Sequence, residues 1–192
     1  MVLHKKCYID TSRHINMKTI ITTILSFFLL NSCFAQQNIA LLGAAITITL
    51  PSEVISITSD QVKAHQMKTF PKAMSLNQDT FPLSNKIHFL IKDKLLSMIG
   101  QQVTVPVDQA TKIKAGLDEL FNGNATYSSE IKKYSDQSVV VITFFNNDMR
   151  NFKFYSYSNK GDRAATGSLT CKLNDLEGAQ LLNQLLDGLK FN

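Results

Sequence analysis

Two stretches in the first half of the chain alternate apolar and polar residues, a pattern that predicts half-buried β-strands. The first stretch covers residues 46–50 and is closed by Pro51. Residues 54–57 are also rich in β-branched residues, which indicates more extended chain. Ser59 follows in a position to cap a short helix.

The second stretch, residues 86–91, carries its apolar residues on one face and places His88 on the polar face. We expect this strand to run on to Met98, because the next residue that breaks the pattern is Gly100. Residues 67–84 contain two prolines and no regular period, which predicts a loop.

The apolar period changes to that of a helix in residues 107–122. Its apolar positions are Ala110, Ile113, Leu117, Leu120 and Phe121. Pro106 or Asp108 is placed to start this helix, and Gly123 is placed to end it.

Four strand-like segments follow this helix: residues 127–134, 138–145, 152–157 and 169–173. The segment 138–145 is β-branched and aromatic throughout, as is typical of a central strand. Turn-forming residues at 146–148 and 158–162 predict hairpins between these strands.

A second helix is predicted near the C-terminus, with Asn174 as its N-cap and Glu177 three residues later, as in a capping box. Its apolar stripe is formed by Leu176, Ala179, Leu182, Leu185, Leu186 and Leu189. Gly188 ends the helix, and residues 189–191 are predicted to return as a short strand. Strands and helices are partly segregated along the chain, which predicts one α+β domain over residues 46–192, an antiparallel sheet packed by helices.

The chain begins with the pattern of a secretory signal peptide. A basic start at Met17 and Lys18 is followed by an apolar run over residues 20–30, shorter than the roughly 20 residues of a membrane span. We therefore predict a signal peptide at residues 17–35 and export from the cell interior. Residues 1–16 show no pattern and are predicted to be an upstream extension of the true start; residues 36–45 are predicted to be a flexible N-terminal segment.

Two processing routes fit the end of the signal peptide. Cleavage after Ala35 would give a free periplasmic or secreted protein that starts at Gln36. Residues 30–33 also resemble a bacterial lipobox, in which Cys33 is lipidated and anchors the protein in the envelope. The mature chain otherwise keeps a single cysteine, Cys171, so its fold is expected to rest on its core and on no internal disulfide.

Composition and charge reduce the number of function classes to consider. The chain has 192 residues, 44% of them hydrophobic, and a net charge of +5. Four basic residues and one acidic residue precede residue 36, so the excess of positive charge belongs mostly to the leader and does not indicate a nucleic-acid partner.

The element order and several segments resemble the PsbP-like superfamily of small exported proteins, which includes DcrB-type lipoproteins. The matching features are the strand that ends in Leu50-Pro51, the helix at 107–122, the hairpins of 138–173 and the ending that runs from Asp175 to Leu189-Lys190-Phe191. The chain departs from many relatives in having Ser52 and no tryptophan after the proline. The resemblance implies an α/β/α sandwich and leaves the function open.

No pattern of residues indicates catalysis, a metal or a cofactor. The chain has no G-x-S-x-G segment and no glycine-rich phosphate loop. The mature histidines, His65 and His88, are too far apart in sequence to form a zinc motif, and Cys171 is expected to be a buried small hydrophobe. We therefore expect a protein that is not an enzyme and that needs no cofactor.

A basic and aromatic group of residues is the candidate interaction surface: Lys132, Lys133, Lys153, Tyr155 and Tyr157. If Phe152 and Phe154 face the core, the tyrosines lie on the other side of their strand, where they are either exposed or packed beneath a helix. The first hypothesis is an accessory domain that binds an envelope protein, with membrane contact only through a lipid on Cys33. The alternative is a domain that binds a small ligand or lipid between its helices and sheet.

Overall fold

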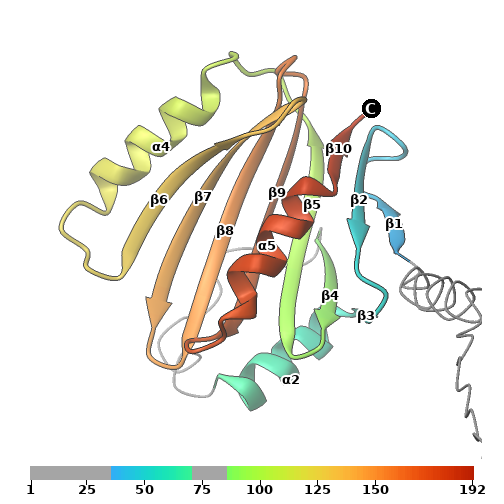
Figure 1. Cartoon of the computed structure of the whole chain (residues 1–192), viewed down its shortest axis with the longest axis vertical. Coiled ribbons are helices and arrows are strands. Elements are labelled where there is room, and N and C mark those ends of the chain that lie inside the picture. Colours follow the sequence, from blue (N-terminus) through green and yellow to red (C-terminus); the bar gives the residue numbers. More distant parts are fainter. Residues whose placement is uncertain (1–35, 71–85) are drawn as a thin grey trace, which may run out of the picture. The chain divides into compact units, whose positions relative to one another are not determined.

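The structure, a computed structural model, describes residues 36–70 and 86–192 (Figure 1). These residues belong to one compact unit that extends from Gln36 to Asn192. The predicted upstream extension (1–16), the predicted signal peptide (17–35) and the candidate lipidation site Cys33 lie outside the described residues.

Ten strands and three helices follow one another in the described part of the chain. In order they are β1 (Gln37–Ala40), β2 (Ile46–Leu50), β3 (Val54–Ile57), α2 (Ser59–Thr69), β4 (Ile87–Ile91), β5 (Lys94–Gln102), α4 (Gln109–Leu120), β6 (Tyr127–Lys133), β7 (Gln137–Asn146), β8 (Met149–Ser158), β9 (Arg163–Lys172), α5 (Glu177–Asp187) and β10 (Leu189–Phe191).

The strands form two antiparallel sheets. The larger has seven strands in the order β3-β4-β5-β9-β8-β7-β6, and the smaller has three in the order β1-β2-β10. Every pair of neighbouring strands is antiparallel. The predicted α+β class, an antiparallel sheet packed by helices, is therefore confirmed.

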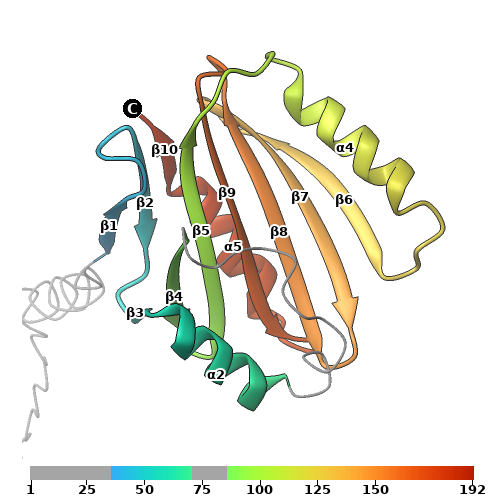
Figure 2. The ribbon, with the colours of Figure 1, turned by 180° about the vertical axis from the view of Figure 1, so that it is seen from behind.

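Helices lie on both faces of the seven-stranded sheet. Helix α5 and strand β2 pack on one face, where the main hydrophobic core lies (Figure 1). Helix α4 packs on the opposite face, over β6, β7 and β8 (Figure 2). Helix α2 lies on that second face at its β4 end, where Ser59 Oγ is 3.5 Å from His88 Nε2.

The apolar run in β7 is continuous because both faces of this strand are covered. Val139 and Val141 belong to the core beneath α5, whereas Val140 and Ile142 belong to a smaller cluster beneath α4. All four side chains are almost fully buried. A strand with one solvated face would alternate apolar and polar residues instead.

A buried glutamine joins the sheet to the end of α5. Gln137 Nε2 donates hydrogen bonds to the carbonyl oxygens of Leu186, at 3.1 Å, and Leu189, at 2.9 Å. The Ser156 hydroxyl donates to Gln137 Oε1. Leu186 lies in the last turn of α5, where carbonyls lack partners within the helix, and Leu189 begins β10, so Gln137 ties the sheet to both elements.

The predicted continuous strand from 86 to Met98 is wrong. The chain turns at Lys92 and Asp93, and β4 and β5 form a hairpin in which Ile91 pairs with Lys94. Lys92 adopts a left-handed conformation with φ of 58°. The turn contains Asp93 but no glycine, proline or asparagine, so the strongest sequence signals of a hairpin are missing.

Two predicted helix starts are also wrong. Thr58 caps α2 instead of Ser59, and it forms a capping box with Gln61. At α5 the N-cap is Leu176 instead of Asn174 and no side chain caps the helix, although Asp175 Oδ1 accepts a hydrogen bond, at 2.9 Å, from the backbone of Glu177. The first difference is a shift of one residue and the second a shift of two, within the usual variation of assigned helix ends.

Two further segments differ from their predictions. Residues 37–40, within the predicted flexible segment, form β1 and pair with β2. Leu176, predicted in the apolar stripe of the last helix, lies before α5 and is 84% exposed. Ala179 is exposed as well, so the stripe of α5 consists mainly of its four buried leucines, Leu181, Leu182, Leu185 and Leu186.

Candidate interaction surface

Strand β8 places Lys153, Tyr155 and Tyr157 on one face of the sheet, as predicted. Phe152 and Phe154 point to the opposite face and are buried in the core beneath α5. Because side chains alternate along a strand, Lys153, Tyr155 and Tyr157 lie on the α4 side.

The two tyrosines are half-buried. They pack against the cluster beneath α4, which includes Val140 and Ile142, and both keep part of their surface exposed. Burial raises the pKa of both hydroxyls, and Tyr155 raises that of Tyr157 further. The two alternatives for the tyrosines, exposure and packing beneath a helix, therefore each hold in part.

Lys153 is half-buried beside them. Its Nζ lies 5.7 Å from the centre of the Phe144 ring, within range of a cation–π interaction. Burial lowers the pKa of Lys153, and the positive charge of Lys86 lowers it further. Two cations, from β8 and from the residue before β4, are thus close enough to repel each other.

Strands β9 and β5 extend this surface across the sheet (Figure 2). Tyr155 pairs with Thr166, and Lys153 pairs with Ser168. On β5 the corresponding residues are Ile99 and Gln101, which pair with Thr166 and Ala164. We define the tyrosine face as these seven partly or fully exposed residues: Lys153, Tyr155, Tyr157, Thr166, Ser168, Ile99 and Gln101.

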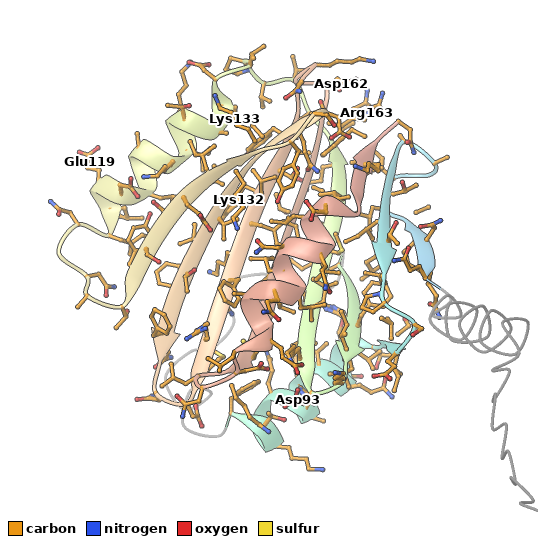
Figure 3. All side chains as sticks on the ribbon, in the orientation of Figure 1. Asp93, Glu119, Lys132, Lys133, Asp162 and Arg163 are labelled. Carbon is orange, nitrogen blue, oxygen red and sulfur yellow. The ribbon has the colours of Figure 1, made fainter. Side chains whose placement is uncertain are left out.

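The two predicted lysines of β6 lie on opposite faces of the sheet (Figure 3). Lys133 pairs with Ser138, which pairs with Tyr157, so Lys133 belongs to the side of the tyrosine face. Lys132 lies on the α5 side, where its Nζ bonds to Asn183 Oδ1 and is 3.2 Å from Glu130 Oε1. Grouping Lys132 with the tyrosines is therefore a wrong prediction, because adjacent strand residues point to opposite faces.

The strands of the seven-stranded sheet contribute only positive charge on the α4 side. The charged side chains that they place there are Lys133, Lys153 and Lys172; Glu130, the one acidic residue within these described strands, lies on the other side. The carboxylate of α4 that points at the sheet, Asp118, accepts hydrogen bonds from Lys114, Ser129 and Tyr127, and these bonds lower its pKa to about 2.

A buried histidine and serine, which sequence reasoning missed, lie on the same face under the start of α2. His88 is on the face opposite Phe89, as predicted, but it is 3% exposed. Its Nδ1 forms a 2.8 Å hydrogen bond with Ser97 Oγ. The signal in the sequence was a histidine and a serine on one face of neighbouring strands, which becomes visible only once the β4–β5 register is known.

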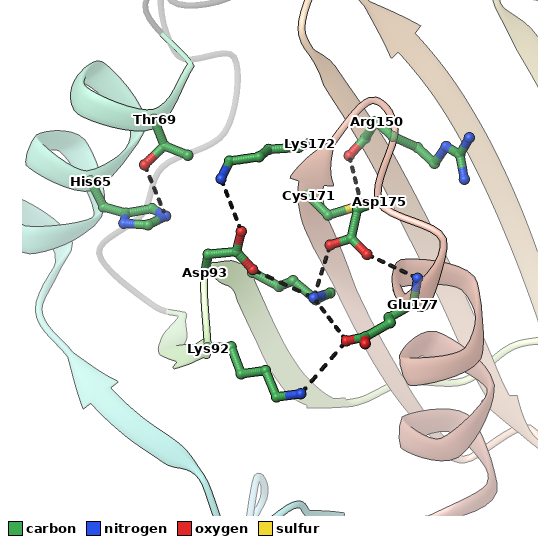
Figure 4. A network of polar contacts seen from close by, with 10 residues as sticks. His65, Thr69, Lys92, Asp93, Arg150, Cys171, Lys172, Asp175 and Glu177 are labelled. Atoms are coloured by element: carbon green, nitrogen blue, oxygen red, sulfur yellow. Dashed lines mark hydrogen bonds and ion pairs between the residues drawn. The ribbon is translucent and has the colours of Figure 1, made fainter.

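A network of charges joins the β4–β5 turn to the start of α5 (Figure 4). Lys94 is buried, and its Nζ lies 2.8 Å from Asp175 Oδ2, 3.5 Å from Asp93 Oδ1 and 3.7 Å from Glu177 Oε2. Burial opposes ionisation of Lys94, but the hydrogen bond to Asp175 and the two aspartate charges raise its pKa overall. Lys92 and Lys172 complete the network.

Cys171 lies beneath this network and is fully buried. Its Sγ is 3.8 Å from the carbonyl oxygen of Arg150 (Figure 4). Burial, followed by the charge of Asp175, raises the pKa of the thiol to about 11. A thiol in this environment is a weak nucleophile, because the reactive species is the thiolate.

No group of three or more histidine, cysteine or acidic side chains among the described residues is arranged to hold a metal ion. None of the helices in residues 36–70 and 86–192 is long and apolar enough to cross a membrane.

The chain matches no protein-family model and no curated protein. Among solved structures it is similar to the Ran-binding protein Mog1p of Saccharomyces cerevisiae, with 12% identity, a TM-score of 0.45 and coverage of 82% of this chain and 96% of that chain. A point mutant of Mog1 gives the same values. A protein from Bacteroides thetaiotaomicron is similar at 10% identity and a TM-score of 0.44, over 78% of this chain and 46% of that chain. At these identities the similarity concerns the fold alone.

Proposed function

We propose that this chain is an exported protein without catalytic chemistry, and that it acts as an accessory domain by binding a protein partner on the tyrosine face. The observation that carries the proposal is the position of Lys153, Tyr155 and Tyr157. These side chains lie together on one sheet face and remain only half-buried, although α4 packs beside them.

Tyrosines in this position suit a binding role. A tyrosine offers a large, rigid contact area and a hydroxyl that forms hydrogen bonds, and it is enriched at protein interfaces. Desolvation of a half-buried ring by a partner removes the rest of its apolar surface from water, at little cost in side-chain entropy. Thr166 and Ser168 add hydroxyl groups beside the rings.

Export is part of the same proposal, with cleavage after Ala35 as the favoured route. The compact unit begins at Gln36 and β1 begins at Gln37, so this cleavage would leave the folded unit whole. Lipidation of Cys33 would leave three residues, spanning at most about 11 Å, between the lipid and β1. The intact mass of the native protein distinguishes a Gln36 start from a triacylated Cys33.

Membership of the PsbP-like superfamily is likewise a proposal, and it is consistent with the α+β fold.

Photocrosslinking in cells tests the partner-binding role. A photoreactive amino acid in place of Gln101 samples the tyrosine face, and one in place of Gln180, an exposed residue of α5, is the matched control. We expect a single envelope protein, recovered near one-to-one, from the Gln101 position only.

The side-chain requirement is tested by the triple variant Lys153→Ala/Tyr155→Ala/Tyr157→Ala. It should lose the crosslinked partner while Lys132→Ala, on the other sheet face, retains it. Crosslinking that survives in a folded triple variant would contradict the proposal. Recovery of no partner, together with a co-purified small molecule in native mass spectrometry, would replace it with the ligand-binding alternative.

A further inference from the structure

We propose that the partner docks on the tyrosine face through an acidic segment of its chain. This inference rests on the proposed function and names the chemistry of the partner. Its basis is the charge and hydrogen-bonding character of the side chains that the strands place on the α4 side.

The charge on this side of the sheet has one sign. The strands contribute Lys133 and Lys153 there, together with Lys172, whose charge is paired with Asp93 at 3.2 Å, and they contribute no aspartate or glutamate. The carboxylate of α4 that bonds to the sheet, Asp118, is held by three donors, including Tyr127 at 2.7 Å. A partner with aspartate or glutamate residues complements this sign, whereas a basic partner is repelled.

The polar groups on the tyrosine face suit a group that only accepts hydrogen bonds. Lys153 donates, and the hydroxyls of Tyr155, Tyr157, Thr166 and Ser168 can each donate. An ionised carboxylate has about four acceptor positions and no donor, so it matches several of these groups at once. Hydrogen bonds to an ionised group are roughly twice as strong as those between neutral groups.

The electrostatic environment of Lys153 supplies a direct readout. Burial and the charge of Lys86 lower the pKa of this lysine. A carboxylate that docks beside it favours the protonated form and raises the pKa. A basic or neutral ligand gives no such increase.

A pair of synthetic peptides tests the inference on the native protein. Both have twelve residues with the same leucines and serines, and one carries four glutamates where the other carries four lysines. We expect the glutamate peptide to bind at least tenfold more tightly at low ionic strength, and to weaken at 0.5 M salt because the ions screen exposed charges. The side-chain NMR signal of Lys153 should report its raised pKa in that complex.

Charge reversal locates the site. Lys153→Glu should lower the affinity for the glutamate peptide at least tenfold. Lys132→Glu, on the opposite face, should change this affinity less than twofold. Lys153→Gln separates loss of the positive charge from repulsion and should give an intermediate effect. Equal binding of both peptides, no binding of either, or tighter binding of a single-stranded oligonucleotide of equal charge would overturn the inference.

The crosslinking experiment keeps the two proposals apart. If a partner is captured from Gln101 but Lys153→Glu leaves its recovery unchanged, the partner-binding role stands and the acidic segment is wrong. If no partner is captured from position 101, and the proteins labelled at Gln101 and at Gln180 are equally well folded, the proposed function itself fails.

Discussion

The two faces of the seven-stranded sheet differ in how their polar groups are satisfied. On the α5 side, the buried side chains of Lys94 and Gln137 are bonded within the chain: Lys94 to Asp175, and Gln137 to the carbonyls of Leu186 and Leu189. On the α4 side, His88 and Ser97 are buried and bonded to each other, but Tyr155 and Tyr157 lie at the border of a smaller apolar cluster and are only half-buried.

Under the proposed function, the α5 side contributes mainly to stability and the tyrosine face mainly to partner binding. A substitution that leaves a buried polar group without its partner lowers the free energy of unfolding. Substitutions on the α5 side should therefore lower stability. A half-buried group can exchange water for a partner, so changes on the tyrosine face should act on binding. The predictions below test this division, from the largest expected effect to the smallest.

Lys94→Met should cause the largest loss of stability. The substitution keeps much of the side-chain volume but leaves Asp175, whose side chain is only 13% exposed, without its cation. Breaking a buried ion pair by removing one partner costs about 3–5 kcal/mol. Urea unfolding followed by circular dichroism measures this change.

Lys92→Met is the matched control, in the same turn and the same network. The Lys92 side chain is 59% exposed and pairs with Glu177 at 3.6 Å. Exposed ion pairs contribute at most about 1 kcal/mol, so its variant should be close to wild type. Equal losses in the two variants would show that burial of Lys94 does not set the strength of the network.

Gln137→Met should cost about 2–3 kcal/mol of unfolding free energy. The variant removes the donor to the carbonyls of Leu186 and Leu189 and the acceptor of the buried Ser156 hydroxyl. Gln102→Met, at an exposed position of β5, should change stability by less than about 0.5 kcal/mol. Thermal and urea unfolding of both variants provide the comparison, and a neutral Gln137→Met would contradict the importance of these bonds.

Substitution of one glycine in α5 and one in α4 allows the packing of the two sheet faces to be compared. A methyl group added at Gly178 of α5 would lie 2.6 Å from Cys171 Sγ, so Gly178→Ala should destabilise by about 1–3 kcal/mol. At Gly116 of α4 nothing lies within 4 Å of the added methyl, so Gly116→Ala should stabilise by about 0.5–1 kcal/mol through helix propensity. Changes of the same sign in the two variants would refute the contrast.

The rate at which Cys171 is alkylated measures how often α5 separates from the sheet. With a thiol pKa of about 11, only about one molecule in a thousand carries the thiolate at pH 8, and the sulfur is fully buried. We expect iodoacetamide to modify the Cys171 peptide at least 100-fold more slowly than in the unfolded chain. Lys94→Met should accelerate the reaction, whereas Tyr155→Phe should not; peptide mass spectrometry measures both rates.

Much of the fold could be predicted because it depends on local patterns. The alternation in β8 and the helical period of α4 each identify an element without knowledge of its neighbours. The β4–β5 turn could not be predicted in this way. Lys92 adopts a conformation that usually favours glycine, and Lys94 starts a strand although lysine is seldom buried. Lys92 pairs with Glu177 and Lys94 with Asp175, two carboxylates at the start of α5 that are distant in sequence.

The candidate surface was predictable in part for the same reason. The positions of Lys153, Tyr155 and Tyr157 follow from alternation within one strand. The side of Lys132 and Lys133 depends on the phase of β6 relative to β7, and this phase is set by which face packs on α4. The contact between His88 and Ser97 requires the register of two strands, so no single segment of sequence indicates it.

The smallest predicted effect is a change in the pH dependence of stability. Burial raises the pKa of Tyr155 and Tyr157 above the unfolded value of about 10, so the folded state holds these protons more tightly than the unfolded state. Their contribution is therefore fully present below pH 10 and is lost as the pH rises through the raised values. Tyr155→Phe/Tyr157→Phe should reduce the fall in unfolding free energy between pH 9.5 and 11 and leave stability at pH 7 within about 0.5 kcal/mol of wild type. Urea unfolding across this range measures the slope. A double variant that loses several kcal/mol at pH 7 would place the tyrosine hydroxyls among the groups that hold the fold together and would end the contrast between the two faces.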